Sequence, residues 1–398
     1  MTDGTLSDEQ LAAYDQADVI FVAQDGFTLA PSRVRAYSFA KACRDRGLSA
    51  EVLSFYDHLN SGNQGSDAID RLSDDDKLRL TLRAFDILSR NPRAVLYMQK
   101  VTYASLSVCM AASRNGNRMV LDYDDFDLTT GVFPPLSRYV QGLQPIPLTE
   151  SIARSADMCI CASQLLYDFM AERNPNTHLL PTGTDLSIFD VSLRDKVERP
   201  KDDLVEIIWL GDIWGQPVMK DVLFAVDAFC HLPESVRALA RFTIVGFGRA
   251  WPWFKDEVAQ RYPFIGAGPG CVHFQERMAP GDVPALLARC DIGCIPLSDQ
   301  LFNRCKSPTK MFEFMAMKVA LCSTPTGEAG RILHDGENAM VAGDRAGYFY
   351  RLGKLIVDAD LRRSVAAQAH ADVVAGLHIG AIGDRLVPLL GSLLLDRS

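Results

Sequence analysis

The residues best suited to chemistry by type and spacing lie between Asn303 and Glu328. Lys310 and Glu313 are three residues apart, which places them on one face if the stretch is helical. A helix start offers unpaired N–H groups and a positive dipole to phosphate, and a carboxylate one turn later can accept hydrogen bonds from a sugar diol. The pair therefore suits a ligand that carries both phosphate and sugar hydroxyls. The alternative is an amphipathic surface helix with an ordinary Lys–Glu pair.

A helix followed by a buried strand must position this pair. Ser307 and Pro308 predict the helix start, with Ser307 as the N-cap and Pro308 at the first helical position. The helix continues through an apolar stripe at helical spacing, formed by Met311, Phe314 and Met315. Residues 319–322 are a short apolar run, as expected of a fully buried parallel strand.

The stretch resembles the donor-site signature of the retaining glycosyltransferases of the large group 1 family, which have the two-domain GT-B fold. That signature reads Lys-x-x-Glu-x-Met-Ala-x-Gly-x-Pro-Val-Val and is followed by a Gly-Glu or Gly-Gly loop. The matching residues here are Lys310, Glu313, Met315, Ala316, Gly327 and Glu328. Lys318 stands where the family usually has Gly, and Ala320 where it has Pro.

Two departures concern the sugar end of the implied site. Relatives usually have another Glu eight residues before the Glu of the signature, in contact with the donor sugar. Cys305 occupies this position, between Arg304 and Lys306. A subset of relatives carries a Lys-Ser-Pro-x-Lys variant, which residues 306–310 resemble. Many relatives also place a His after the third strand of the first domain, near the sugar. Gln99 follows that strand here and is a candidate substrate contact. These changes leave open which sugar the donor carries and whether the protein is catalytic.

Composition predicts an ordinary globular protein of two or three domains, with 48% hydrophobic and 23% charged residues. The net charge of -9 argues against a nucleic-acid binder, which needs a basic face. The first ten residues are polar and acidic, and no apolar run approaches the roughly 18 residues of a membrane span. We therefore expect a cytoplasmic protein, with peripheral membrane contact left open. Several of the ten cysteines lie in strand-like apolar runs and are expected to be core thiols.

Strands and helices alternate through both halves of the chain, which predicts parallel sheets covered by helices on both faces. The first half has predicted strands at 18–23, 51–55, 94–98, 118–122 and 156–162, and helices at 33–46 and 76–90. The second half has predicted strands at 205–210, 241–246, 271–274 and 291–296, and helices at 220–229 and within 275–289. Residues 57–75 predict a loop, and the charged segment 191–203 predicts a linker between domains.

Two segments after strands of the first half are candidate ligand contacts. Residues 30–37 resemble the opening of the same glycosyltransferases, in which a small-residue loop faces the interdomain cleft. Ser32, Arg33 and Arg35 are therefore candidates for donor phosphate or acceptor, and arginines at a solvent-exposed helix start are the alternative. The acidic cluster 122–127 begins with Asp122 and could hold a divalent cation or cap a turn. We expect a structural or acceptor-binding role and no metal.

Glycines at strand ends of the second half predict further phosphate contacts, because a phosphate approaches a backbone N–H more closely where no Cβ intervenes. Gly211, followed by Lys220 at a predicted helix start, is similar to the first loop of the family's second domain, where a cation neutralises the donor diphosphate. Gly246 and Gly248 end the next strand. The segment from Phe274 to Met278 is a candidate for binding the base.

The resemblance implies an α/β chain with two Rossmann-like domains, 1–190 and 204–374, that face each other across a cleft. Residues 375–398 would form a helix that crosses back to the first domain. The implied activity is transfer of a sugar from a nucleoside diphosphate sugar to an unknown acceptor, with retention and without metal or other cofactor. The implied cations are Lys220, Arg304, Lys306 and Lys310. The alternatives are a non-catalytic subunit that binds nucleotide sugars and a sugar-nucleotide epimerase of the same fold.

Overall fold

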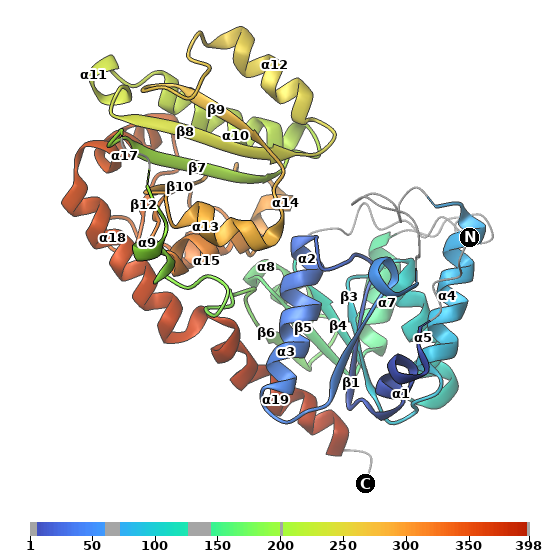
Figure 1. Cartoon of the computed structure of the whole chain (residues 1–398). Helices are drawn as coiled ribbons and strands as arrows, with labels where there is room; N and C mark the ends of the chain where they lie inside the picture. Colours follow the sequence, from blue (N-terminus) through green and yellow to red (C-terminus); the bar gives the residue numbers. More distant parts are fainter. Residues whose placement is uncertain (1–5, 60–71, 126–144, 200–201, 396–398) are drawn as a thin grey trace. The chain divides into compact units, whose positions relative to one another are not determined.

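The computed structural model describes residues 6–59, 72–125, 145–199 and 202–395 (Figure 1). The chain divides into two compact units, and each contains its own six-stranded sheet. The first unit comprises residues 1–183, 305–307 and 379–398, and the second comprises 184–304 and 308–378. Each sheet pairs its strands in parallel throughout, which confirms the predicted doubly wound α/β architecture.

The sheet of the first unit has the strand order β2-β1-β3-β4-β5-β6. Its strands are β1 (Val19–Ala23), β2 (Ala50–Ser54), β3 (Val95–Gln99), β4 (Met119–Tyr123), β5 (Met158–Cys161) and β6 (Thr177–Leu179). Residues along one strand alternate between the two covering layers. In β1, Ile20 and Val22 join one apolar cluster, whereas Val19 and Phe21 join the other. Both faces are therefore buried, as the apolar strands predict.

Helices cover both faces of this sheet. They are α1 (Asp8–Gln16), α2 (Ala30–Ser32), η1 (Arg33–Tyr37), α3 (Ser38–Arg44), η2 (Phe55–Leu59), α4 (Asp74–Leu88), α5 (Tyr103–Asn115), α7 (Pro145–Ser155), α8 (Gln164–Ala171) and α19 (Ile379–Leu395). The last helix, α19, packs beside α3 through Ile382, Leu386 and Leu390, which are all completely buried. Arg385 also donates a hydrogen bond to the Leu179 carbonyl, so the end of the chain is tied to the first unit (Figure 1).

The helix predicted at 33–46 is interrupted at its start. Residues Arg33–Tyr37 form a π-helical turn, and regular α-helix begins only at Ser38. Both the backbone N–H and the hydroxyl of Ser38 donate to the carbonyl of Arg33, five residues earlier. This widened turn contains Arg35, which is completely buried. Sequence periodicity does not report such a turn, because the apolar face continues through it.

The second sheet has the order β12-β11-β10-β7-β8-β9. Its strands are β7 (Val205–Asp212), β8 (Ala240–Phe247), β9 (Val272–Glu276), β10 (Ile292–Ile295), β11 (Ala320–Ser323) and β12 (Met340–Val341). The surrounding helices are α9 (Leu193–Lys196), α10 (Gln216–Cys230), α11 (Glu234–Arg237), α12 (Trp251–Arg261), η3 (Pro280–Asp282), α13 (Val283–Leu287), α14 (Leu301–Arg304), α15 (Thr309–Ala316), α16 (Glu328–Ile332), α17 (Arg345–Val357), α18 (Ala359–Asp372) and η4 (Val373–Leu377).

Two predicted helix starts are wrong. Helix α15 begins at Thr309 with Pro308 as its N-cap, and the Ser307 side chain does not cap it. Pro308 has an extended backbone, so the helix starts one residue after the predicted position. Helix α10 begins at Gln216, because Gly215 provides an extended N-cap and Pro217 suits the first turn. Lys220 therefore lies in the second turn of α10 and not at its start.

Candidate functional site

The strand order of the second sheet reverses between β7 and β10. The chain runs outward from β7 through β8 to β9, then crosses over and runs outward from β10 to β12. In open α/β sheets, ligands bind beyond the carboxyl ends of the strands at such a reversal, because the loops there diverge to opposite faces. The β7/β10 reversal is therefore the candidate site. The predicted residues Gly211 and Gly246 lie at the carboxyl ends of β7 and β8, and Gly248 follows β8.

Gly211 and Lys310 meet at the reversal although they are far apart in sequence. The Nζ atom of Lys310 lies 4.2 Å from the centre of the Trp209 ring, over its face. Gly211 has φ +152, and a Cβ on it would lie 2.8 Å from Nζ of Lys310. The glycine thus leaves room for the ammonium group beside the end of β7. A cation over an indole face is stabilised by the ring quadrupole, so Trp209 fixes the position of this charge.

The loops after β7 and β8 are joined by backbone hydrogen bonds. Ile213 N–H donates to the Phe247 carbonyl at 2.7 Å, and Ala250 N–H donates to the Ile213 carbonyl at 2.9 Å. Gly248 has φ +101 and packs so closely on Ile213 that a Cβ would meet its carbonyl oxygen at 2.9 Å. Gly246 is likewise covered by the Trp251 ring. The glycines are therefore required for close packing of these loops.

Phe274, the first residue of the candidate base-binding segment, is partly buried and packs against the core of the second unit. Its ring packs edge-on against Trp251, with ring centres 5.6 Å apart. Glu276 accepts hydrogen bonds from Nε1 of Trp251 at 2.8 Å and from Lys255 at 2.7 Å. The hydrogen bond from Lys255, and to a smaller extent the one from Trp251, lowers the pKa of the Glu276 carboxyl below its ordinary value. The end of β9 is thus fixed to α12, and Phe274 belongs to that packed support.

A buried polar cluster that no sequence pattern indicated anchors the segment before α15. Asp221 of α10 accepts hydrogen bonds from the Ser298 N–H at 3.0 Å and from Nδ2 of Asn303 at 2.8 Å. Asn303 is completely buried, and its Oδ1 accepts no hydrogen bond from the described residues. The neighbouring Arg304 is exposed and paired with Asp299. These contacts span 77 and 82 residues in sequence, so no local pattern could have shown them.

The other predicted residues of the second unit lie at several positions along this edge. Glu313 is buried in α15, with 4% of its surface exposed. Gly327 has φ +61 and forms the N-cap of α16, and Glu328 begins that helix and pairs with Arg331 at 3.3 Å. Lys220 is exposed on α10. The structure thus brings Lys310 and Gly211 together, whereas Lys220 is not in the turn where the sequence placed it.

Residues 305–307 group with the first unit. Ser307 accepts a hydrogen bond from the Thr182 N–H through its hydroxyl, at 3.2 Å. Cys305 is buried in the apolar core of this unit. Burial, reinforced by the charge of Asp125, raises the pKa of the Cys305 thiol to about 12. The thiol is therefore a neutral core group at ordinary pH. Lys306, half-buried, lies between these two residues in sequence.

Three predicted residues of the first unit also lie near its strand reversal, which falls between β1 and β3. Ser32 is buried and donates a hydrogen bond from its hydroxyl to Oε1 of Gln99 at 3.2 Å, across the ends of the two strands. Arg33 donates to the carbonyl of Phe27 at 3.4 Å. Ser32 and Gln99 are thus brought together, whereas Arg33 folds back on its own loop.

Asp122 is completely buried in an ion pair with Arg35. Nε of Arg35 donates to Oδ2 of Asp122 at 2.9 Å, and Nη2 donates to Oδ1 at 2.5 Å. Arg35 also donates to the carbonyls of Leu180 and Pro181. Burial alone would lower the pKa of Arg35. The charge of the adjacent Asp122 carboxylate has the larger combined effect with its hydrogen bonds, so the pKa of Arg35 is above its ordinary value. This geometry favours the structural role among the alternatives for Asp122. Arg35, predicted as a ligand contact, is likewise completely buried and donates to groups of the protein itself. Residues 126 and 127 of the acidic cluster lie outside the described residues.

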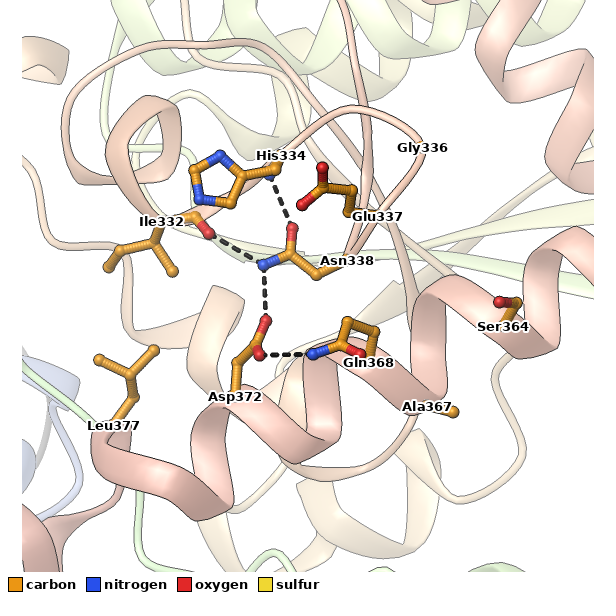
Figure 2. A pocket seen from close by; sticks show the side chains of 10 residues that line it. All are labelled: Ile332, His334, Gly336, Glu337, Asn338, Ser364, Ala367, Gln368, Asp372 and Leu377. Atoms are coloured by element: carbon orange, nitrogen blue, oxygen red, sulfur yellow. Dashed lines mark hydrogen bonds between the residues drawn. The ribbon is translucent and has the colours of Figure 1, made fainter.

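A pocket of about 990 Å³ lies elsewhere in the second unit (Figure 2). It is lined by the loop before β12 and by α18, and Figure 2 shows its polar network. Asp372 accepts hydrogen bonds from Nδ2 of Asn338 at 2.7 Å and from Nε2 of Gln368 at 2.8 Å. Because that loop enters β12 at its amino end, the pocket is on the opposite edge of the sheet from the reversal site. None of the predicted site residues lines it.

Further features bear on cofactors, cysteines and membranes. Within the described ranges, no three His, Cys, Asp or Glu side chains are grouped so that they could hold a metal ion. All ten cysteines lie in described residues, and none forms a disulfide. None of the helices that the structure describes is both long enough and apolar enough to cross a membrane.

Comparisons with known proteins agree with this architecture. Residues 205–358 match the model of the family "Glycosyl transferases group 1". No curated protein matches the sequence. Among solved structures, HepE from Anabaena in complex with UDP and glucose has a TM-score of 0.66 at 16% identity, with 95% of this chain and 100% of that chain covered.

Two further solved structures are similar over nearly their whole length. Sucrose-phosphate synthase from Thermosynechococcus elongatus has a TM-score of 0.70 at 12% identity, and covers 95% of this chain and 100% of its own. An E. coli structure described as trehalose-6-phosphate bound with UDP-2-fluoro glucose has a TM-score of 0.66 at 11% identity, and covers 93% and 98%. The chain therefore has the GT-B fold, and its residues 205–358 are similar to the group 1 glycosyltransferase domain.

Proposed function

We propose that this protein is a glycosyltransferase that moves a sugar from a nucleoside diphosphate sugar to an acceptor. The observation that carries the proposal is the position of Lys310 at the β7/β10 reversal, over Trp209 and beside the Cβ-free Gly211. A fixed ammonium group beside an open backbone suits a diphosphate. The solved structures of HepE contain UDP, UDP with glucose or UDP-glucose, and we extend the uridine nucleotide to this chain as the first donor to test.

The proposed chemistry is electrostatic. When the bond between the anomeric carbon and the diphosphate breaks, negative charge builds up on the leaving phosphate. Lys310 and the N-terminal N–H groups of α15 would meet that charge with positive groups already in place, so little reorganisation is needed during the step. Arg304, Lys306 and Lys220 are further proposed cations. Glu313 would accept hydrogen bonds from the ribose diol, and the segment after Phe274 would contact the base.

Retention of anomeric configuration and independence from metal are part of the proposal. The cations of this chain would supply the positive charge that a divalent ion contributes in other phosphate-transferring enzymes. Turnover should therefore persist in excess EDTA, and the product of a transfer from an α-linked donor should be an α-glycoside. Proton NMR of the anomeric signal distinguishes the two products.

The decisive experiment combines binding and turnover. Thermal unfolding would be followed with UDP, GDP, ADP and their glucose conjugates, with release of free nucleotide measured in the same samples. A ligand at 100 times its dissociation constant should add about 2.7 kcal/mol to the free energy of unfolding. The stabilisation should be lost in Lys310→Met. The control is Lys354→Met, because Lys354 also lies near an aromatic ring, that of Tyr350, in another part of the second unit.

A non-catalytic nucleotide-sugar-binding subunit is the second candidate. It is favoured by Cys305, which replaces the usual sugar-contacting carboxylate of the family with a buried neutral thiol. Binding of a nucleoside diphosphate sugar without hydrolysis or transfer, over a broad panel of sugar acceptors, would support this candidate. Absence of any nucleotide-induced stabilisation would contradict both candidates.

A further inference from the structure

The pocket between the loop before β12 and α18 has a polar support that fixes its shape (Figure 2). Asn338 is buried, with 3% of its surface exposed. Its Oδ1 accepts from the His334 N–H at 2.7 Å, and its Nδ2 donates to the Ile332 carbonyl at 2.9 Å and to Oδ2 of Asp372 at 2.7 Å. The loop is thus tied to α18, so a ligand would enter a site that is already ordered.

The pocket is large enough for a small molecule and has two unlike ends. Its volume of about 990 Å³ lies at the upper end of the range of small-molecule sites, which is roughly 300–1,000 Å³. Figure 2 shows Ile332 and Leu377 at one end and Ser364 at the other. Both apolar side chains are partly buried against the core of the second unit. A ligand can therefore place an aliphatic segment at the first end while its polar groups meet the rest of the lining.

The polar side chains of the lining have more acceptor than donor capacity left. Both hydrogens on Nδ2 of Asn338 are already donated. Gln368 donates through Nε2 to Oδ1 of Asp372 at 2.8 Å, whereas its Oε1 accepts no hydrogen bond from the described residues. The Glu337 carboxylate has no partner in the described part of the chain. Each carboxylate oxygen accepts about two hydrogen bonds, so Asp372 also retains capacity. A lining rich in acceptors favours a ligand that brings donors.

The charge of the lining favours the same kind of ligand. Glu337 and Asp372 contribute two carboxylates, and no Lys or Arg is among the described residues that line the pocket. Asp335, in the same loop, differs from Glu337, because its carboxylate accepts from Nε and Nη2 of Arg351 at 2.8 and 2.6 Å. The loop thus pairs one of its acidic side chains within the protein and leaves Glu337 at the pocket. A cationic ligand would supply a partner for it.

A purely structural role explains Asp372 but not Glu337. Asp372 joins the loop to α18, which serves the fold even when no ligand is bound. Glu337 is exposed in a turn, and its side chain joins nothing else in the described ranges. A substitution of Glu337 therefore separates a contribution to ligand binding from a contribution to the fold.

We propose that this pocket binds a small organic cation that has several N–H donors and a short aliphatic segment, such as a diamine or an alkylguanidine. Glu337 and Asp372 accept hydrogen bonds from its ammonium or guanidinium group, and the apolar end of the pocket contacts its aliphatic segment. Hydrogen bonds between ionised groups are the stronger class. The pocket and the proposed donor site lie at opposite edges of the sheet, so this binding goes beyond the proposed transfer reaction and does not depend on it.

Calorimetric titration of the full chain with putrescine and with agmatine, in the absence of nucleotide, tests the proposal. Butanediol with a hydroxyl at each end is the neutral counterpart of putrescine. The titrations are done at about 0.15 M salt, where the Debye length is about 8 Å, so that general attraction to a protein of net charge -9 is screened. We expect at least one of the two cations to bind and the diol not to bind.

Two variants change the pocket and a third is the control. Glu337→Gln removes a charge with little change in size, and Ala367→Phe fills the pocket from α18 without a change in charge. Glu234→Gln is the matched control, because Glu234 is an exposed glutamate of α11 that does not line the pocket. The dissociation constant of the bound cation should rise about tenfold in Glu337→Gln and Ala367→Phe and stay unchanged in Glu234→Gln. Thermal unfolding of each variant checks that it is folded.

Several results would overturn the proposal: binding of neither cation at millimolar concentration, equal affinity for putrescine and the diol, or unchanged affinity in the folded Glu337→Gln and Ala367→Phe variants. An equal loss in Glu337→Gln and Glu234→Gln would assign the binding to the overall charge of the protein and would overturn it as well. UDP binding is measured separately by thermal stabilisation. Its absence would count against the proposed donor site and leave cation binding at this pocket intact, so the two failures are distinguishable.

Discussion

The ammonium nitrogen of Lys310 lies 4.2 Å from the centre of the Trp209 indole ring, at the point where the second sheet reverses its strand order. The two residues come from α15 and β7, which are separated by about a hundred residues of chain. Trp209 fills the space beside Lys310 and holds the lysine near the backbone of Gly211. One aromatic residue of the sheet thus positions the cation on which the proposed donor site depends.

Gly211→Ala should weaken nucleotide binding without unfolding the protein. The new Cβ would lie 2.8 Å from Nζ of Lys310, and the lysine end would move because it is flexible. We expect at least a tenfold loss of UDP affinity, which corresponds to about 1.4 kcal/mol. Calorimetric titration measures it. Gly266→Ala is the matched control, since Gly266 has φ +155, close to the +152 of Gly211, but its nearest contact is 3.9 Å away. Equal losses in both variants would assign the effect to backbone strain.

Arg35→Met should destabilise the first unit strongly. The substitution leaves the Asp122 carboxylate buried without its partner and removes the donor to the Leu180 carbonyl. Loss of one partner of a buried ion pair costs about 3–5 kcal/mol. Urea denaturation measures this change. The double variant Arg35→Met/Asp122→Asn should recover part of the loss, because no charge is then left buried. A loss below about 1 kcal/mol in the single variant would contradict the structural role of the pair.

The strands could be predicted well because each is a short apolar run between turn residues. The strand predicted at 205–210 is observed as Val205–Asp212, and the one at 18–23 as Val19–Ala23. Helix starts were predicted less well. The start of α10 depends on Gly215 and Pro217, whereas the predicted start was Lys220, chosen for its charge. A local propensity decides where a helix begins, and a functional motif does not.

The candidate site could be predicted only where its residues are neighbours in sequence. Lys310 and Glu313 stand in one helical segment, and Gly211 ends a strand. Trp209 was missed because its role depends on a lysine in another element. Contacts between distant segments and backbone strain are properties of the folded chain. Periodicity and spacing do not contain them.

His58 should make stability depend on pH. Its Nδ1 accepts a hydrogen bond from the Ser54 N–H at 2.9 Å, which requires a neutral imidazole, and burial lowers its pKa in the folded protein. The unfolded chain therefore binds a proton first as the pH falls. The stabilising contribution is complete above the unfolded pKa of about 6.5 and decreases below it, until the folded pKa is reached.

The variant His58→Asn tests this dependence, because Oδ1 of Asn can accept from the same N–H. We expect the wild-type protein to lose more free energy of unfolding than His58→Asn between pH 7.5 and pH 5.5, measured by urea denaturation at each pH. His178→Asn belongs in the same series, since burial also lowers the pKa of His178. Parallel pH profiles for the wild type and His58→Asn would show that His58 does not contribute.

Asp221→Ala should loosen the loop that leads to α15. Asp221 is the acceptor for both the Ser298 N–H and the Asn303 side chain, and Asn303 is completely buried. Removal of the carboxylate takes away one acceptor from each of these donors, although the Asn303 side chain still donates to the carbonyl and hydroxyl of Ser298. Hydrogen bonds to charged groups contribute about 1.5–3 kcal/mol, and we expect a loss of that order. The same change should lower UDP affinity, because the loop sets the start of the helix that carries Lys310 and Glu313. Asp299→Ala is the comparison. Its pair with Arg304 is exposed and should contribute about 0–1 kcal/mol. If Asp221→Ala lowers stability but leaves UDP affinity unchanged, Asp221 stabilises the fold without positioning the donor site.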